Sequence, residues 1–220
     1  MQFLYDEKAG ENKIYLKDEA FHHLKVRRAK QAQRLNVRNL RDEFLYHYVI
    51  DELQKNSCVL ILQGKSLNLK ATNKTSLALG VIDPKILEKT LPFLNELGLY
   101  KLILVFTNFS QRNFVLDFDR LNRILINSCQ QCGRGDLMQF ECFNSTQDFA
   151  NAYKNAIMLD FSAKSDDFSV ISEKDILFVG AEGGFNDSER ALFERKIKLK
   201  SPYILKSQST VIAAVAKILL

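Results

Sequence analysis

The chain has 220 residues, 46% of them hydrophobic, which is enough to bury the core of one large domain or two small ones. Its apolar stretches are far shorter than the roughly 20 residues of a membrane-spanning helix, and its start lacks the features of a secretory signal. We therefore expect a cytoplasmic protein without a membrane segment. The net charge is +5, and residues 21–41 alone carry seven cations and no acid, so the positive excess lies in this one segment.

Up to about residue 70 the pattern predicts a small β-rich unit. Short runs of β-prone residues, separated by polar turns, favour antiparallel strands that curl into a barrel. The expected strands are residues 13–16, 35–40, 44–50 and 58–62. A short helix is expected over residues 19–29, and a boundary near residue 70.

Beyond residue 70 the sequence predicts strands that alternate with helices. The expected strands are residues 77–81, 102–106, 137–143, 157–159 and 176–179. The expected helices are residues 84–97, 117–132, 148–154, 187–196 and 210–220. Strands that are almost entirely apolar and alternate with helices predict a parallel sheet covered on both faces.

A glycine-rich turn follows the strand expected at residues 176–179. Its glycines Gly180, Gly183 and Gly184 permit positive φ angles and a close approach of the backbone to a ligand. Such a ligand is expected at the carboxyl end of a parallel strand. Asn186 and Glu189 form a capping pair that should start the next helix. An ordinary tight turn has the same spacing, and the glycines match neither the dinucleotide nor the P-loop pattern.

The four cysteines lack the dense spacing of a disulfide framework, and we expect reduced thiols. Cys129 and Cys132 form a C-x-x-C near a helix end, for which packing in the core is favoured over redox or zinc chemistry. For His22 and His23, RNA contact or local hydrogen bonding is favoured over catalysis. We expect no metal site.

Five segments together resemble one family. Residues 177–185 are similar to its "iGPEGGfs..E" signature and residues 21–28 to "HHL.kVLR". Residues 94–99, 127–134 and 204–210 resemble its "atELGv", "eA.eQsgR" and "ILR.ETA" segments. On these motifs the chain resembles the RsmE family, the uracil-N3 methyltransferases of 16S ribosomal RNA in the SPOUT (trefoil-knot) superfamily.

The resemblance implies an α/β fold with two domains. A small PUA-like β-barrel would bind RNA over residues 1–70, and a SPOUT trefoil-knot domain with a parallel sheet would carry the methyltransferase activity over residues 71–220. It further implies the cofactor S-adenosyl-L-methionine, a substrate in 16S rRNA of the small ribosomal subunit, and a homodimer.

The resemblance also implies a cofactor site and a catalytic residue. The residues expected around the cofactor are Gly180, Glu182, Gly183, Gly184, Leu199, Ile204 and Leu205. They can supply the apolar walls and main-chain hydrogen bonds that adenine needs. Uracil N3 must lose a proton as it attacks the methyl group, and Arg134 is the candidate for stabilising the resulting anion or gripping a phosphate. No general base is assigned.

The cations near the N-terminus indicate phosphate contact, although such a run can also be a solvated face. The RNA-binding candidates are His22, Lys25, Arg27, Arg28, Lys30 and Arg34. The rings of Phe21, Tyr46 and Tyr48 could stack on bases or lie in the core.

Three positions depart from the family's pattern. Ala181 replaces a proline, Lys206 an arginine and Gln208 a glutamate. An alternative therefore stays open: a non-catalytic RNA-binding or ribosome-assembly factor with a degenerate SPOUT fold.

Overall fold

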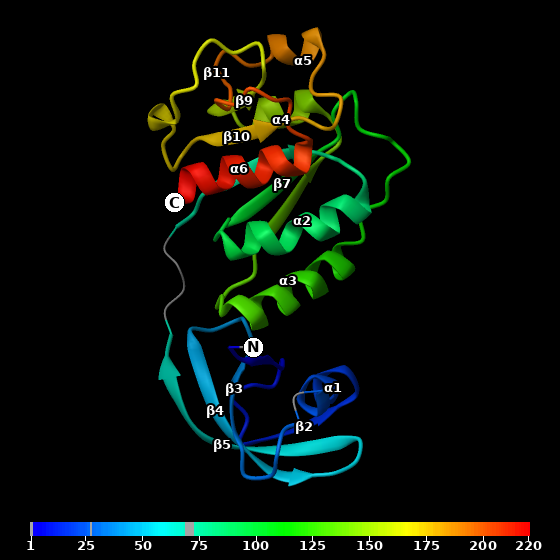
Figure 1. Ribbon diagram of the computed structural model, residues 1–220, viewed down its shortest axis with the longest axis vertical. Helices are drawn as coiled ribbons and strands as arrows, with labels where there is room; N and C mark the ends of the chain where they lie inside the picture. Colours follow the sequence, from blue (N-terminus) through cyan, green and yellow to red (C-terminus); the bar gives the residue numbers. More distant parts are fainter. Residues whose placement is uncertain (1, 27, 69–72) are drawn as a thin grey trace. The chain divides into compact units, whose positions relative to one another are not determined.

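The computed structural model describes residues 2–26, 28–68 and 73–220, which divide into two compact units (Figure 1). The barrel unit consists of Met1–Ala71 and Ile126–Leu137, and the sheet unit of Thr72–Leu125 and Met138–Leu220. Each unit has its own sheet.

The barrel unit contains a curled sheet of five strands in the order β1-β3-β4-β5-β2, with one helix. Its elements are β1 (Leu4–Tyr5), β2 (Lys13–Lys17), α1 (Asp18–Val26), β3 (Arg34–Arg38), β4 (Phe44–Leu53) and β5 (Ser57–Leu67). All neighbours pair antiparallel except β1 and β3. Alternate residues of β2 and β4 are buried, so one face of the sheet forms the core, to which α1 contributes Phe21 and Leu24.

A second apolar cluster in the barrel unit involves the end of α3 (Phe118–Cys132). Cys129 packs there with Phe3 and Leu40. Gln130 accepts hydrogen bonds from the backbone N–H groups of Gln2 and Tyr5, through its carbonyl and side-chain oxygens respectively. This cluster explains why residues 126–137 belong to the same unit as the N-terminal strands.

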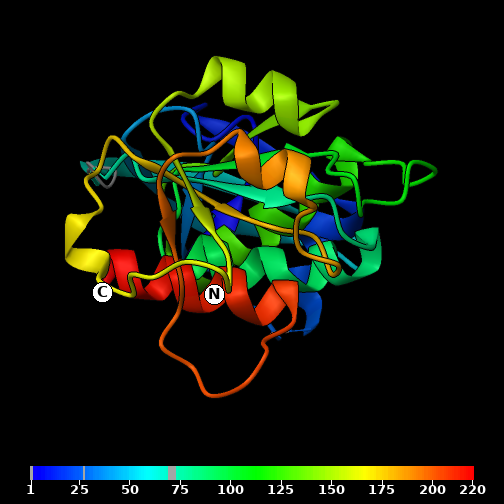
Figure 2. The same ribbon diagram turned by 90° about the horizontal axis from the view of Figure 1, so that it is seen from above.

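The sheet unit contains six parallel strands in the order β11-β9-β10-β6-β7-β8. The strands are β6 (Ser76–Gly80), β7 (Lys101–Val105), β8 (Gln139–Phe143), β9 (Ala156–Leu159), β10 (Ile176–Val179) and β11 (Lys196–Ile197). Its remaining helices are α2 (Pro84–Glu96), α4 (Thr146–Ala152), the 3-10 helix η1 (Phe168–Val170), α5 (Asp187–Ala191) and α6 (Ser207–Leu219). Figure 2 shows α4 on one side of the sheet and α2 and α6 on the other. The predicted parallel sheet covered on both faces is confirmed.

The main error in the predicted elements is the helix expected over residues 187–196. It ends at Ala191, and Lys196 and Ile197 instead form the edge strand β11 beside β9. No helix breaker marks this point in the sequence, because pairing with β9 is a tertiary interaction that overrides local helix propensity. The strand β1 and the extension of β5 to Leu67 were also missed.

The part of the chain that the structure describes lacks two features. None of the helices described is long and apolar enough to cross a bilayer. Nor do the described His, Cys, Asp and Glu side chains form a group of three or more that could hold a metal ion.

Candidate active site

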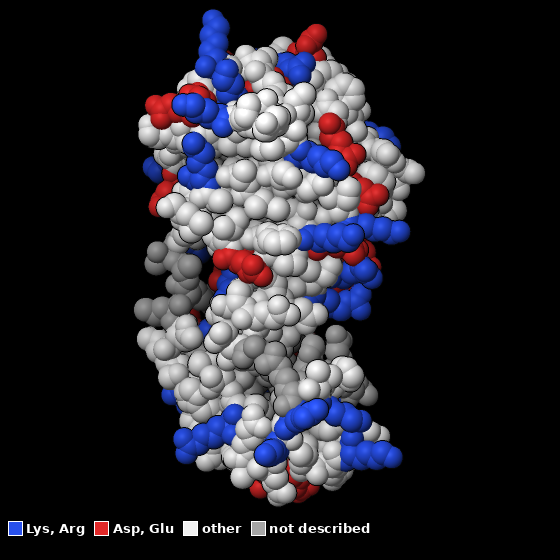
Figure 3. Space-filling model, viewed as in Figure 1, with Lys and Arg blue, Asp and Glu red and all other residues white. Residues whose placement is uncertain are grey.

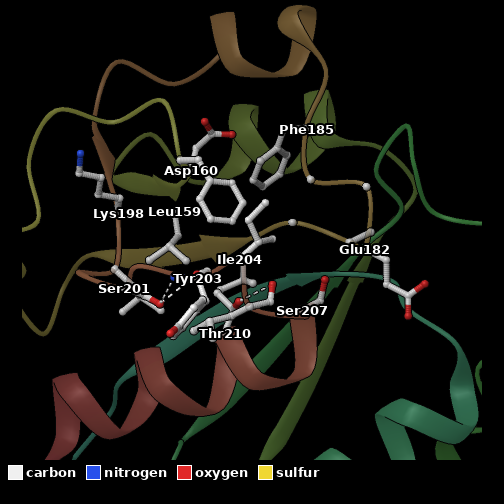
Figure 4. A pocket seen from close by; sticks show the side chains of 18 of the residues that line it. Leu159, Asp160, Glu182, Phe185, Lys198, Ser201, Tyr203, Ile204, Ser207 and Thr210 are labelled. Carbon is white, nitrogen blue, oxygen red and sulfur yellow. Dashed lines mark hydrogen bonds between the residues drawn. The ribbon is translucent and has the colours of Figure 1, made fainter.

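A pocket lies at the carboxyl ends of β9 and β10 in the sheet unit (Figure 4). Its volume is about 790 Å³, including the part that opens to solvent. Three segments supply most of its lining: the residues that follow β9, the glycine-rich turn after β10, and the connection from β11 to α6. The helices α5 and α6, with the last residues of β9 and β10, supply the rest. Carboxyl ends of neighbouring parallel strands are where ligands bind in open α/β sheets.

The glycine-rich turn is a tight reversal in which the backbone packs closely against itself and against β6. Gly184 adopts a φ of +71° and donates a backbone hydrogen bond of 2.8 Å to the carbonyl of Ala181. A Cβ on Gly180 would lie 3.0 Å from the backbone of Gly184. Gly80, the last residue of β6, approaches so closely that its Cβ would lie 2.5 Å from the backbone nitrogen of Ala181. The turn therefore presents main-chain groups to the pocket.

The end of the turn is anchored by an aromatic side chain and a helix cap. Phe185 is buried, and the centroid of its ring lies 4.8 Å from the ring centroid of Phe178 in β10. Asn186 then caps α5, and its side chain and that of Glu189 exchange hydrogen bonds with each other's backbone N–H groups. The predicted capping pair is confirmed.

An ion pair forms part of the pocket wall. Asp160, directly after β9, accepts a hydrogen bond of 3.0 Å from Nε of Arg190 and one of 2.8 Å from the backbone N–H of Ser162. Burial raises the pKa of Asp160, but the hydrogen bonds from Ser162 and Arg190 outweigh it and hold the pKa below its usual value. Asp160 is therefore a fixed negative charge on this wall.

The connection from β11 to α6 supplies apolar side chains. Tyr203 and Ile204 line the pocket and are 76% and 84% exposed, and Leu205 follows them. Ser201 holds the tip of the connection, because its hydroxyl both donates to the carbonyl and accepts from the N–H of Tyr203. Figure 4 shows Tyr203 close to Ser201 and Ile204 next to it, on the side of the pocket where α6 lies. Exposed apolar residues beside a pocket are suited to cover a flat, apolar ligand.

The structure brings all seven residues predicted around the cofactor to this one pocket: Gly180, Glu182, Gly183, Gly184, Leu199, Ile204 and Leu205. Whether they bind the cofactor stays a prediction. The polar lining residues that the sequence analysis missed are Asp160, Arg190, Lys198, Ser201, Ser207 and Thr210. Asp160 could have been found, because it directly follows a buried parallel strand.

The predicted catalytic residue belongs to the barrel unit and is not among the residues that line the pocket. The guanidinium of Arg134 pairs with the carboxylate of Asp136, with Nη2 3.1 Å from Oδ2 and Nε 3.3 Å from Oδ1. The catalytic role of Arg134 stays a prediction.

The predicted RNA-binding residues lie along α1, the loop after it and the start of β3. His22, Lys25, Arg28, Lys30 and Arg34 are exposed, and Arg27 lies outside the described residues. Lys and Arg side chains project from the surface shown in Figure 3. These placements are compatible with contact to phosphates, which stays a prediction.

Arg38, one of the seven cations of residues 21–41, is not at the surface. Its exposed fraction is 1%. The rings of Phe21, Tyr46 and Tyr48 are buried as well, so the structure places them in the core and not where bases could stack. The C-x-x-C pair is divided: Cys129 is buried and Cys132 is exposed.

Comparison with known proteins places the whole chain in one group. A family model described as "RNA methyltransferase domain" matches residues 68–219, and one described as "RNA methyltransferase PUA domain" matches residues 16–63. Two proteins called "Ribosomal RNA small subunit methyltransferase E", from Helicobacter pylori strains J99 and 26695, are each 42% identical over 99% of this chain and 100% of their own length.

Solved structures share the fold. A methyltransferase from Legionella pneumophila, solved with S-adenosylmethionine bound, has a TM-score of 0.82 at 21% identity and covers 99% of this chain and 97% of its own. A ribosomal RNA small subunit methyltransferase E from Neisseria gonorrhoeae, also bound to S-adenosylmethionine, has a TM-score of 0.81 at 18% identity, with 99% and 96% covered.

The fold and the matched domains define an RNA methyltransferase with a PUA domain. The predicted α/β class is confirmed: a methyltransferase domain with a parallel sheet, preceded by a PUA-like unit with a curled sheet. The trefoil knot stays a prediction. The chain belongs to the ribosomal RNA small subunit methyltransferase E family.

Proposed function

We propose that this protein transfers a methyl group from S-adenosyl-L-methionine to N3 of a uridine in 16S ribosomal RNA of the small subunit. The observation that carries the proposal is the pocket at the carboxyl ends of β9 and β10, lined by a glycine-rich turn and apolar side chains. Family membership supports the reaction and the substrate. The protein would act in the cytoplasm on ribosomal RNA, as a homodimer like other SPOUT proteins.

The residues of the pocket fit this cofactor. Backbone crowding at Gly180 and Gly80 excludes side chains and leaves main-chain groups for the adenine edge. Leu199 and Ile204 would provide apolar contact to its faces. The carboxylates of Glu182 and Asp160 suit a ligand that carries a sulfonium, an ammonium group and ribose hydroxyls. When bound, the cofactor would supply an activated methyl group for transfer to N3 of the uracil.

Catalysis requires that the uracil lose its N3 proton. Arg134 would stabilise the negative charge that develops on the base, or hold the adjoining phosphate, because its guanidinium stays charged and presents a planar set of donors. In the free protein this side chain is held by Asp136, so it is pre-oriented before RNA binds. No side chain is assigned as the general base.

The exposed cations of α1 and the following loop would hold the phosphate backbone of the RNA. Residues 1–70 would thus form the RNA-binding domain and residues 71–220 the methyltransferase domain. This division assigns substrate positioning to one part of the chain and cofactor binding to the other.

Methylation in vitro tests the reaction directly. The protein is incubated with labelled S-adenosylmethionine and 16S rRNA, either free or in assembled subunits, and the product is mapped by mass spectrometry. We expect one methyl group on N3 of one uridine, and a methyl group elsewhere would disprove the proposed specificity. Arg134→Ala should lower turnover at least about 100-fold while folding is retained, and an unchanged rate would dismiss the role of Arg134.

The changes at Ala181, Lys206 and Gln208 leave one competing function, a non-catalytic assembly factor. Calorimetric titration with S-adenosylmethionine separates the two. A methyltransferase should bind with measurable heat, whereas a degenerate scaffold should bind RNA and give no heat with the cofactor.

A further inference from the structure

Arg38 is an unusual cation because it is buried in the barrel unit without a full set of acceptors. Its side chain is 1% exposed, and Nε and Nη1 have no hydrogen-bond partner among the described residues. Nη2 makes one long bond of 3.4 Å to the carbonyl of Asn68. Buried polar groups are nearly always satisfied, so a guanidinium with two unused donors requires an explanation.

The buried guanidinium lies directly against the loop that carries Arg134. A Cβ on Gly135 would lie 2.6 Å from Nη2 of Arg38 and 2.8 Å from its Cζ and Nη1. Gly135 is not among the glycines with positive φ, so it is contact with Arg38, and not backbone geometry, that excludes a side chain there. Arg38 thus reaches the residue between Arg134 and Asp136.

Two carboxylates act on Arg38. Burial lowers the pKa of Arg38, while the charges of Asp42 and Asp136 raise it. Asp42 is already engaged, because its oxygens accept from the Asn39 side chain, the Tyr46 hydroxyl and the Phe44 N–H, each at 2.8 Å. Asp136 is instead committed to the guanidinium of Arg134.

Binding of RNA by Arg134 would carry a free-energy cost at Asp136, and Arg38 can lower that cost. If Arg134 turns toward a phosphate, Asp136 loses its partner, and its side chain is only 19% exposed. An unpaired carboxylate at such a site is costly. The guanidinium of Arg38 lies against Gly135, the residue directly before Asp136. Its positive charge persists because arginine does not lose its proton in proteins.

We propose that Arg38 is a positioning residue that takes over the carboxylate of Asp136 when Arg134 exchanges it for an RNA phosphate. The proposal rests on the proposed function only in that Arg134 contacts RNA. Arg38 itself touches no substrate, and its buried charge makes the release of Arg134 less costly.

A double-mutant cycle on RNA affinity tests this exchange. The dissociation constant for a 16S rRNA fragment is measured by filter binding for wild type, Arg38→Met, Asp136→Asn and the double variant. Arg38→Met alone should weaken binding about tenfold, because Asp136 then keeps hold of Arg134. In the Asp136→Asn background the same change should have no effect, since no charge remains to be taken over. An equal loss in both backgrounds would overturn the proposal.

Two further variants provide an independent perturbation of Arg38 and a control. Gly135→Ala displaces the guanidinium without changing any charge, and it should reproduce the weakened binding; wild-type affinity would count against the proposal. It also replaces Arg38→Met in the cycle if that variant does not fold. Arg41→Met removes a cation that is exposed and paired with Glu7, and its effect should add to that of Asp136→Asn.

Binding is measured without turnover, which separates the two proposals. If the protein methylates no uridine but shows the coupling, the proposed function is wrong and the proposed exchange stands. If it methylates N3 but the effects of the two substitutions are only additive, the proposed function stands and the proposed exchange is wrong.

Discussion

The carboxylate of Glu189 accepts a hydrogen bond of 2.9 Å from the backbone N–H of Asn108, although the two residues are 81 positions apart. The same carboxylate accepts from the hydroxyl of Thr146 and the N–H of Asn186. These three partners follow β7, β8 and β10, so one buried side chain joins three connections at the carboxyl end of the sheet.

Replacement of Glu189 by alanine should destabilise the protein by about 3 kcal/mol, because buried donors would lose their acceptor. Urea denaturation followed by circular dichroism measures the change. Glu194→Ala is the matched control, since Glu194 is exposed and should alter stability by less than about 0.5 kcal/mol. Equal effects at the two positions would show that the buried carboxylate is not an anchor.

Gly80→Ala should deform the cofactor turn. The added Cβ would lie 2.5 Å from the backbone nitrogen of Ala181, and backbone cannot move aside as a flexible side chain can. We expect a loss of about 1–3 kcal/mol in stability and at least about tenfold weaker binding of S-adenosylmethionine, measured by calorimetry. Gly64→Ala is the control, because no atom lies within 4 Å of its added Cβ. Undiminished affinity in Gly80→Ala would mean that the turn does not shape the site.

Asp160 should make stability depend on pH. Its pKa is lowered in the folded protein, so its contribution is present above the unfolded value of about 4 and is lost as the pH falls through the folded value. The difference in stability between wild type and Asp160→Asn should therefore be largest near pH 7 and shrink below about pH 4. Urea titrations at pH values from below about 4 up to about 7 measure it. Asp166→Asn, at an exposed position, controls for the loss of a charge, and a difference that stays constant with pH would refute the assignment.

RNA binding should weaken steeply with added salt if the cations of the barrel unit neutralise phosphates. Replacing Lys25 and Lys30 by alanine should reduce the slope of log affinity against log salt by about 0.7–0.9 for each phosphate that is no longer neutralised. Replacement of Lys85 and Lys89, which are exposed on α2, should leave the slope unchanged. A slope that responds equally to both pairs would mean that the cationic segment has no special role.

The periodicity of the apolar residues was sufficient to predict the parallel sheet and most of its helices, because burial on both faces leaves continuous apolar strands. It failed at residues 192–196, which the sequence predicts as helix, because α5 ends at Ala191 and Lys196 and Ile197 form β11. The seven cations counted in residues 21–41 include Arg38, which the structure buries. Its neighbours include Phe3, Asn68 and Gly135, all distant from it in the sequence, so no local pattern indicates its burial.

The sequence by itself determined the α/β class, the glycine-rich turn, the cap at Asn186 and the family, because each depends on residues close together in the chain. Only the tertiary structure decided that Asp160 and Arg190 share a pocket wall with that turn, and that Glu189 joins three connections. The physical reason is that a buried charge is stable only beside its partners, and folding brings those partners together from distant parts of the chain.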